Sequence, residues 1–167
     1  MNSFDTIVIG SGPGGYVCAI RCAQLGMNVA IIEKYNNLGG TCLNVGCIPS
    51  KSLLESSELF HKAITDFSEH GISAVPKYDF SKMISRKSKV VKENSEGLNF
   101  LMKKNNISVF HGVGYLNKKG EVEIKNNGDK KVLKSKNIVI ATGSKPIVPS
   151  FITFDKKRVI TSTEALS

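Results

Sequence analysis

Apolar and polar positions along the chain divide it into short apolar runs and longer segments with helical spacing. Four runs are rich in valine and isoleucine, as buried parallel strands are: residues 4–10, 28–33, 107–110 and 137–141. Three segments have the length and periodicity of helices: residues 14–25, 47–67 and 79–104. Because strands and helices alternate, this order predicts an α/β fold with a doubly wound, Rossmann-like parallel sheet.

Two stretches of the chain depart from this alternation. Residues 113–133 are short strand pieces separated by Asn- and Gly-rich turns, which predicts a small antiparallel β-meander. Residues 85–92 are polar, so we expect this part of the last long helix to protrude from the domain body. The periodicity is lost after Pro149, so we expect one domain over residues 1–149 and the start of a connection over residues 150–167.

Composition limits the class of protein. With 167 residues and 41% hydrophobic residues, the chain is long enough for one well-packed domain. No apolar run reaches the roughly 18 residues that cross a bilayer, and the strand pattern begins too early for a signal peptide, so we expect no membrane partner and a cytoplasmic or mature mitochondrial-matrix protein. The net charge of +9 comes from scattered lysines. They do not form the basic face with interleaved aromatic residues that nucleic-acid binding requires, so we expect no nucleic-acid partner.

A glycine fingerprint follows the first predicted strand. Gly10, Gly12 and Gly15 form G-x-G-x-x-G between a strand and a helix. In a dinucleotide site the first glycine permits the turn, the second admits a pyrophosphate and the third allows close packing. Glu33 ends the next strand, where a carboxylate accepts hydrogen bonds from ribose hydroxyls and disfavours a 2′-phosphate. The fingerprint therefore predicts FAD or NAD rather than NADP.

Two cysteines, Cys42 and Cys47, stand four residues apart shortly after this fingerprint. A disulfide needs Cα atoms within roughly 7 Å, so a pair at this spacing meets only in a tight turn, for which Gly46 supplies backbone freedom. Such a pair beside a nucleotide predicts thiol–disulfide chemistry, with flavin as the electron acceptor. Cys47 begins a helix, which lowers the pKa of a thiol, so we assign it to the flavin side and Cys42, as the more exposed sulfur, to the substrate.

The remaining cysteines do not suggest a metal site. Cys18 and Cys22 lie one turn apart on a helix that must pack on the sheet, and their spacing to the other pair is not that of zinc ligands. We therefore expect no metal and assign both to the core.

With these residues in view, the chain resembles the N-terminal part of the flavin-dependent pyridine nucleotide–disulfide oxidoreductases, and of their dihydrolipoamide dehydrogenases in particular. The matching segments are residues 10–16, 33–51, 141–144 and 161–166. The Cys-x4-Cys block is specific to the family. Glutathione and mercuric reductases share it, whereas the run after Cys42 looks more like the lipoamide enzymes.

The resemblance implies a set of FAD contacts in this sequence. They are the pyrophosphate glycines Gly10, Gly12 and Gly15, the ribose residues Glu33 and Lys34, the turn Gly40-Thr41-Cys42, Lys51 near the flavin ring, Gly114 at the adenine, and the turn Thr142-Gly143-Ser144. It also implies that dihydrolipoamide, free or on the lipoyl domains of 2-oxoacid dehydrogenase complexes, reduces a Cys42–Cys47 disulfide. Electrons then pass to FAD and on to NAD⁺.

The chain is about a third of the length of the family's members. The NAD-binding domain, the dimerisation domain of the family's homodimers and the catalytic base lie in the remainder, and His61, His70 and His111 do not match that base. We therefore expect the 167 residues to be unable to complete the NAD-linked cycle alone. Two alternatives remain: a non-catalytic flavin- or partner-binding remnant, and the corresponding part of a glutathione- or mercuric-reductase-type enzyme.

Overall fold

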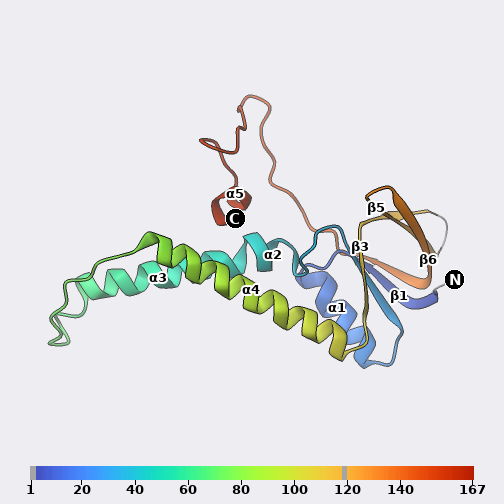
Figure 1. Cartoon of the computed structure of the whole chain (residues 1–167), viewed down its shortest axis with the longest axis horizontal. Coiled ribbons are helices and arrows are strands. Elements are labelled where there is room, and N and C mark those ends of the chain that lie inside the picture. The colour runs from blue at the N-terminus through green and yellow to red at the C-terminus, as the bar shows by residue number, and fades with distance from the viewer. Residues whose placement is uncertain (1–2, 118–119) are drawn as a thin grey trace.

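The structure is a computed structural model that describes residues 3–117 and 120–167 (Figure 1). Its strands are β1 (Ser3–Ile9), β2 (Val29–Glu33), β3 (Ser108–His111), β4 (Val113–Leu116), β5 (Glu121–Asn126) and β6 (Asp129–Ile140). Its helices are α1 (Pro13–Gln24), α2 (Gly40–Val45), α3 (Cys47–Thr65), α4 (Phe80–Lys104) and α5 (Ser162–Leu166). None of the helices in these ranges is long and apolar enough to cross a membrane.

The strands form one mixed sheet in the order β3-β2-β1-β6-β5-β4. The pairs β3–β2, β2–β1 and β1–β6 are parallel, and β6–β5 and β5–β4 are antiparallel. The connection from β1 through α1 to β2 is the βαβ unit that the sequence predicts. The α/β class is thereby confirmed, with the predicted parallel strands β3-β2-β1-β6 and the predicted antiparallel meander as two parts of one mixed sheet.

The last strand corrects one boundary. The sequence pattern separates a meander ending near Leu133 from a strand at 137–141, but β6 runs without a break through both. Its first half pairs antiparallel with β5 and its second half pairs parallel with β1, and Lys134 is in register with a residue on each side. The polar residues 134–137 therefore interrupt the apolar run without ending the strand.

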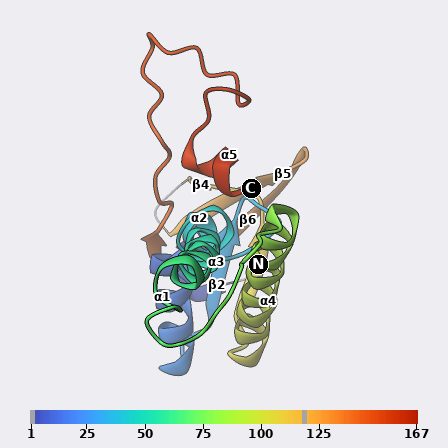
Figure 2. The ribbon, with the colours of Figure 1, turned by 90° about the vertical axis from the view of Figure 1, so that its left-hand side faces the viewer.

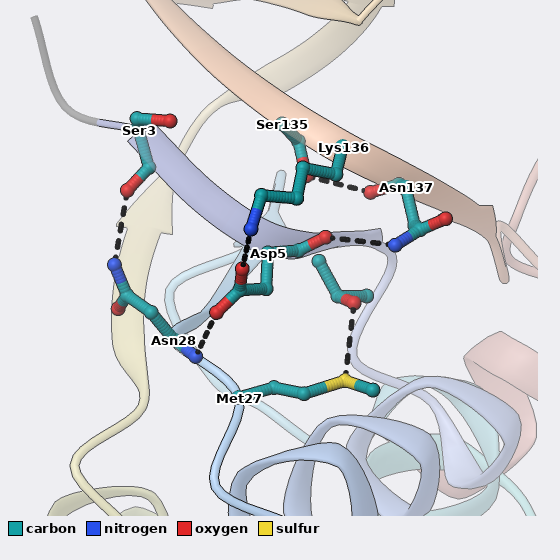
Figure 3. A network of polar contacts seen from close by, with 8 residues as sticks. Ser3, Asp5, Met27, Asn28, Ser135, Lys136 and Asn137 are labelled. Atoms are coloured by element: carbon teal, nitrogen blue, oxygen red, sulfur yellow. Dashed lines mark hydrogen bonds and ion pairs between the residues drawn. The ribbon is translucent and has the colours of Figure 1, made fainter.

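These polar residues of β6 bind β1 instead of forming a turn (Figure 3). The Lys136 ammonium donates to Oδ1 of Asp5 at 2.8 Å, and the side-chain amide of Asn137 donates to the Asp5 carbonyl at 3.1 Å. The other carboxylate oxygen of Asp5 accepts the Asn28 amide at 2.9 Å. The carboxylate of Asp5 thus connects the residue before β2 to β6, at the end of the sheet where β1 begins.

The core has two parts, one on each face of the sheet. On one face, buried residues of the three helices α1, α2 and α4 pack on alternate residues of β1 and β2: Ala19, Leu43, Leu98 and Met102 against Val8, Val29 and Ile31. On the other face, the intervening strand residues meet the meander: Ile7, Ile9 and Ile32 against Val122, Ile124 and Leu133. Helices thus cover one face and the meander covers the other.

Two segments extend away from this body. The helices α3 and α4 lie side by side and project beyond the sheet as an arm, and residues 141–161 run out as an extended segment before α5 returns beside α2 (Figures 1 and 2). The arm projects with its tip at residues 66–79, which join the two helices. The polar stretch 85–92, which was expected to protrude, lies in α4 of this arm. One of its residues is nevertheless buried, because Lys87 is only 4% exposed and its Nζ donates to the Leu166 carbonyl at 3.0 Å.

Candidate functional site

The two cysteines of the Cys-x4-Cys block form a disulfide, as predicted. Cys42 lies within α2 and Cys47 is the first residue of α3, with 4.6 Å between their Cα atoms. Gly46 between the helices permits this approach, because a Cβ there would lie 2.8 Å from the Thr41 carbonyl oxygen and 3.2 Å from Cα of Cys42. The glycine is needed for close packing, and its φ of −146° is one that other residues adopt.

The surroundings of the two sulfurs correct one expectation. The sequence predicts Cys42 as the more exposed cysteine, but Cys42 is half-buried within a helix, whereas Cys47 is exposed. Burial of the neighbouring Leu43 against the core explains this, because it fixes α2 to the body of the domain. Pro49, fully buried in the first turn of α3, fixes the Cys47 side in the same way.

The glycine loop has the geometry that its fingerprint predicts. Gly10 has a φ of +101°, and a Cβ on it would lie 2.3 Å from the Ala141 carbonyl oxygen. A Cβ on Gly15 would lie 1.9 Å from the Gly10 carbonyl oxygen, so only glycine fits where α1 crosses β1. Gly12 caps α1, and its carbonyl accepts the Gly15 amide at 2.8 Å and the Tyr16 amide at 2.9 Å. The partial positive charge at this end of the helix is suited to an anion.

The fold brings the glycine loop and the disulfide segment together. The amide of Gly39, the residue that caps α2, donates to the Ser11 carbonyl at 3.0 Å. A Cβ on Gly40 would lie 2.7 Å from Cα of Gly12, so the two backbones are in contact. Two motifs that are about 30 residues apart in the sequence thus form one site at the carboxyl ends of β1 and β2, where α/β sheets bind nucleotides.

Glu33, the predicted ribose ligand, is 5% exposed at the end of β2. Its Oε2 accepts the Ser11 amide at 2.9 Å and the Ser11 hydroxyl at 2.6 Å, and its Oε1 accepts the Tyr35 amide at 3.0 Å. Three donors therefore satisfy this buried carboxylate with hydrogen bonds.

The other predicted contacts lie around this centre in different environments. Thr41 is exposed at the start of α2, Lys51 is exposed on α3, and Lys34 lies over the Tyr35 ring at 4.9 Å. Gly114 lies in β4, where a Cβ would lie 3.2 Å from Ile9 and 3.4 Å from Ile32. The turn of Thr142, Gly143 and Ser144 is exposed directly after β6.

Cys18 and Cys22 are not part of the disulfide, and both are half-buried against the core on α1. Burial raises the pKa of the Cys18 thiol, and the neighbouring Cys22 raises it further. A thiol in this environment is less reactive than an exposed one at neutral pH. The position of the pair agrees with the packing role that the sequence suggests.

Sequence reasoning missed two polar residues near the site. Ser11 is completely buried and contacts Glu33 and Gly39, yet within the fingerprint it is an unspecified position. Arg86 of α4 donates to the Ser52 carbonyl at 3.1 Å and the Ser52 hydroxyl at 2.9 Å, and pairs with Glu55, so it joins the arm to the helix that begins at Cys47. No spacing rule links residues this far apart in the chain.

An α/β domain in which the segment that carries the disulfide contacts the glycine loop is typical of a dinucleotide-dependent disulfide oxidoreductase. The sequence profile of the pyridine nucleotide-disulphide oxidoreductases matches residues 4–167, and the chain belongs to this family. Family membership implies FAD and a nicotinamide dinucleotide as cofactors.

Relatives of known name agree with this assignment. The chain is 47% identical to dihydrolipoyl dehydrogenase of Manduca sexta, over 98% of this chain and 33% of that one. It is 45% identical to dihydrolipoyl dehydrogenase 3 of Pseudomonas putida, over 100% of this chain and 36% of that one. It is also 44% identical to a leghemoglobin reductase of Vigna unguiculata, over 98% of this chain and 32% of that one. The chain spans about a third of the length of these relatives.

A solved structure supports the fold. The Cu(II) complex of the HOCl-induced flavoprotein disulfide reductase RclA from Escherichia coli matches with a TM-score of 0.76 and 28% identity. The match covers 90% of this chain and 31% of that one. The likeness thus extends over nearly the whole chain and confirms the α/β fold with its mixed sheet.

Proposed function

We propose that this chain is the FAD-binding part of an NAD-linked dihydrolipoyl dehydrogenase, which oxidises dihydrolipoamide through the Cys42–Cys47 disulfide. The observation that carries this proposal is the position of the disulfide: it closes at the start of α3, on a segment whose backbone touches the glycine loop. The high identity to dihydrolipoyl dehydrogenases over the whole chain supports the choice of substrate.

The residues present fit a dinucleotide. The space beside Gly14 in the first turn of α1 is open, since a Cβ there would meet nothing within 4 Å, and the buried carboxylate of Glu33 ends the next strand. The residues that would hold FAD are Gly10, Gly12, Gly15, Glu33, Lys34, Gly40, Thr41, Cys42, Lys51, Gly114, Thr142, Gly143 and Ser144. When bound, FAD accepts an electron pair from the dithiol and passes it to NAD⁺.

The protein's own part of the reaction is thiol–disulfide exchange. A thiolate of dihydrolipoamide attacks Sγ of Cys42, the Cys42–Cys47 bond breaks, and Cys47 leaves as a thiolate. The second thiol of the substrate then attacks the mixed disulfide, so that lipoamide is released and Cys42 leaves as a thiol. The substrate has lost two electrons and two protons: one proton goes to solvent when its first thiol ionises, and the other goes to Cys42. The chain has gained the two electrons and is left with a thiol at Cys42 and a thiolate at Cys47. The N-terminus of α3 favours the Cys47 thiolate, because that end of a helix carries partial positive charge.

The same proposal extends to partners. Lipoyl domains of 2-oxoacid dehydrogenase complexes would present the substrate, and a homodimer with a nicotinamide domain would complete the cycle. Residues 1–149 are then the FAD-binding domain, and residues 150–167 begin the connection to the nicotinamide domain.

The test is an absorbance titration of the purified chain with FAD, followed by reduction with dihydrolipoamide. We expect long-wavelength charge-transfer absorption on reduction, because a thiolate at Cys47 would lie against the flavin. Cys47→Ser should abolish this band, whereas Cys22→Ala, which removes a half-buried thiol on α1, should retain it.

Other outcomes distinguish the alternatives. Reduction by glutathione but not by dihydrolipoamide would indicate a glutathione-reductase-type enzyme. Bound FAD with no reduction of the disulfide by either thiol would indicate a non-catalytic flavin-binding unit. A folded chain that binds neither FAD nor ADP would contradict the proposed cofactor site.

A further inference from the structure

Ser11 is a buried side chain at which three separate segments meet. It lies in the glycine loop, and its hydroxyl donates to Oε2 of Glu33 at 2.6 Å. The same hydroxyl oxygen accepts the Gly39 amide at 3.2 Å, and the Ser11 carbonyl accepts that amide at 3.0 Å. Ser11 is completely buried, and its hydroxyl donates one hydrogen bond to a carboxylate and accepts one from an amide.

The contacts of Ser11 determine which part of Glu33 is available to a ligand. A carboxylate oxygen has two lone pairs, and the amide and hydroxyl of Ser11 occupy both acceptor positions of Oε2. The Tyr35 amide occupies one position of Oε1. With the donors of residues 3–117 and 120–167, one acceptor position, on Oε1, is left for a donor outside the protein.

We propose that Ser11 is a positioning residue for adenosine recognition, acting through Glu33. Its hydroxyl holds Oε2 so that Oε1 faces the ribose with one acceptor, which takes the hydroxyl of an unmodified ribose. The inference rests on the proposed function, since it takes an adenine dinucleotide as the ligand. It adds to that function the residue that orients the Glu33 carboxylate. A 2′-phosphate finds only a buried negative group at this position, so the arrangement selects against it.

Ser11 also ties the ribose site to the disulfide segment. Gly39 caps the helix that carries Cys42, and both of its bonds to the glycine loop go to Ser11. The residue that orients Glu33 therefore also sets where α2 begins. Loss of the hydroxyl leaves the backbone bond in place, so we expect α2 to persist in variants at this position.

A ligand-based cycle with ADP and 2′,3′-dideoxyADP tests the proposal on the full 167-residue chain. ADP carries the ribose hydroxyls and the dideoxy analogue lacks them, while both share the adenine and the pyrophosphate. We expect Ser11→Ala to weaken ADP binding about tenfold, the size expected for one lost hydrogen bond to a charged group. The same variant should change binding of 2′,3′-dideoxyADP by less than about twofold, because that ribose offers Glu33 no donor.

Controls keep the outcome decisive. Ser57→Ala, which removes an exposed hydroxyl of α3 bonded to the Leu54 carbonyl, should leave both affinities unchanged. Ser11→Gly provides a second variant without the hydroxyl if Ser11→Ala does not fold. Equal losses for the two nucleotides, or none for ADP, would overturn the role of Ser11 while leaving the nucleotide site intact. A folded wild-type chain that binds neither nucleotide would overturn the proposed cofactor site and this inference with it.

Discussion

The site and the outlying segments of this molecule are held together by different means. At the site, the glycine loop, the end of β2 and the disulfide segment touch through their backbones, and a Cβ on Gly10, Gly15 or Gly40 would clash. In the arm and the C-terminal segment, which also pack on their neighbours, the polar connections are made by single long side chains: Arg86 joins α4 to α3, and Lys87 joins α4 to α5.

This difference explains where substitutions should matter. A backbone contact leaves no room for a side chain, so a single methyl group has to displace a strand or a helix. A side-chain connection in a partly solvated place can be replaced by water at modest cost. We therefore expect the effects of substitution to be largest at the site, smaller in the arm, and smallest at the end of the sheet where β1 begins.

The largest effect is expected for Gly15→Ala. Its Cβ would lie 1.9 Å from the Gly10 carbonyl oxygen and 3.4 Å from Cβ of Ala141, so α1 has to move off the sheet. We expect a loss of about 3 kcal/mol or more in the free energy of unfolding, measured by urea denaturation, at the upper end of what overpacking costs.

Gly14→Ala is the matched control for this substitution. Gly14 lies in the same turn of α1 with nothing within 4 Å of a Cβ, and alanine favours a helix over glycine by about 1 kcal/mol. Gly14→Ala should therefore leave the chain as stable or more stable. Similar losses at both glycines would mean that the loop tolerates no side chain for reasons other than this close contact.

The same difference separates what the sequence predicts from what it does not. The βαβ unit, the sharp turn at Gly10, the burial of Glu33 and the closeness of Cys42 to Cys47 follow from local rules on glycine, strand ends and helix starts. The burial of Lys87 and the continuity of β6 do not follow, because each depends on a partner far along the chain. The exposure of the two disulfide cysteines was also not predictable, since it depends on how α2 packs against the core.

Within the arm, Arg86→Met should have an intermediate effect. The guanidinium donates twice to Ser52, which is nearly buried, and pairs with Glu55 in a place that is largely exposed. We expect a loss of about 1 kcal/mol in the free energy of unfolding, since the Ser52 contacts dominate and the exposed ion pair adds little.

Two substitutions sharpen this result. Arg86→Lys keeps the charge but not the two-pronged donor, so it should lose most of the same stability. Lys92→Met, which removes an exposed i,i+4 pair with Glu96 on the same helix, should change the free energy of unfolding much less. A loss at Lys92 as large as that at Arg86 would show that general charge, and not the contact with Ser52, stabilises the arm.

At Lys87 we expect a local effect. Its ammonium is buried with the Leu166 carbonyl as its partner, so Lys87→Met removes the bond that holds α5 while also removing a buried charge, and the two changes offset one another in overall stability. The Ala165 amide, which donates to the Thr161 carbonyl at 3.1 Å, should then exchange with solvent about fivefold faster, the equivalent of about 1 kcal/mol of local opening. Exchange measured by NMR tests this, with the exposed Lys89→Met as the control. Unchanged exchange at Ala165 would show that α5 is held by its packing on α2 alone.

The smallest effect on stability is expected for Asp5 and Lys136, at the end of the sheet where β1 begins, and it depends on pH. The hydrogen bond from Lys136, followed by the Asn28 amide, lowers the pKa of Asp5 below its ordinary value, and Asp5 in turn raises the pKa of Lys136. Because the folded pKa of Asp5 is the lower one, its contribution to stability is present above about pH 4 and is lost as the pH falls through the folded value. For Lys136 the sign is reversed, so its contribution is present below about pH 10 and is lost at higher pH.

Asp5→Asn should therefore lower the urea midpoint slightly at pH 6, and this difference should shrink as the pH falls through the folded pKa of Asp5, because the wild-type carboxyl then becomes protonated as well. Lys136→Met removes the first cause of the shift, so the pKa of Asp5, followed by NMR titration of its carboxyl, should rise toward the ordinary value. A midpoint difference that does not shrink as the pH falls would mean that Asp5 acts through its uncharged contacts. The end of the sheet where β1 begins would then be stabilised by close contacts, as the site is. The contrast between backbone contacts and side-chain connections would not apply there.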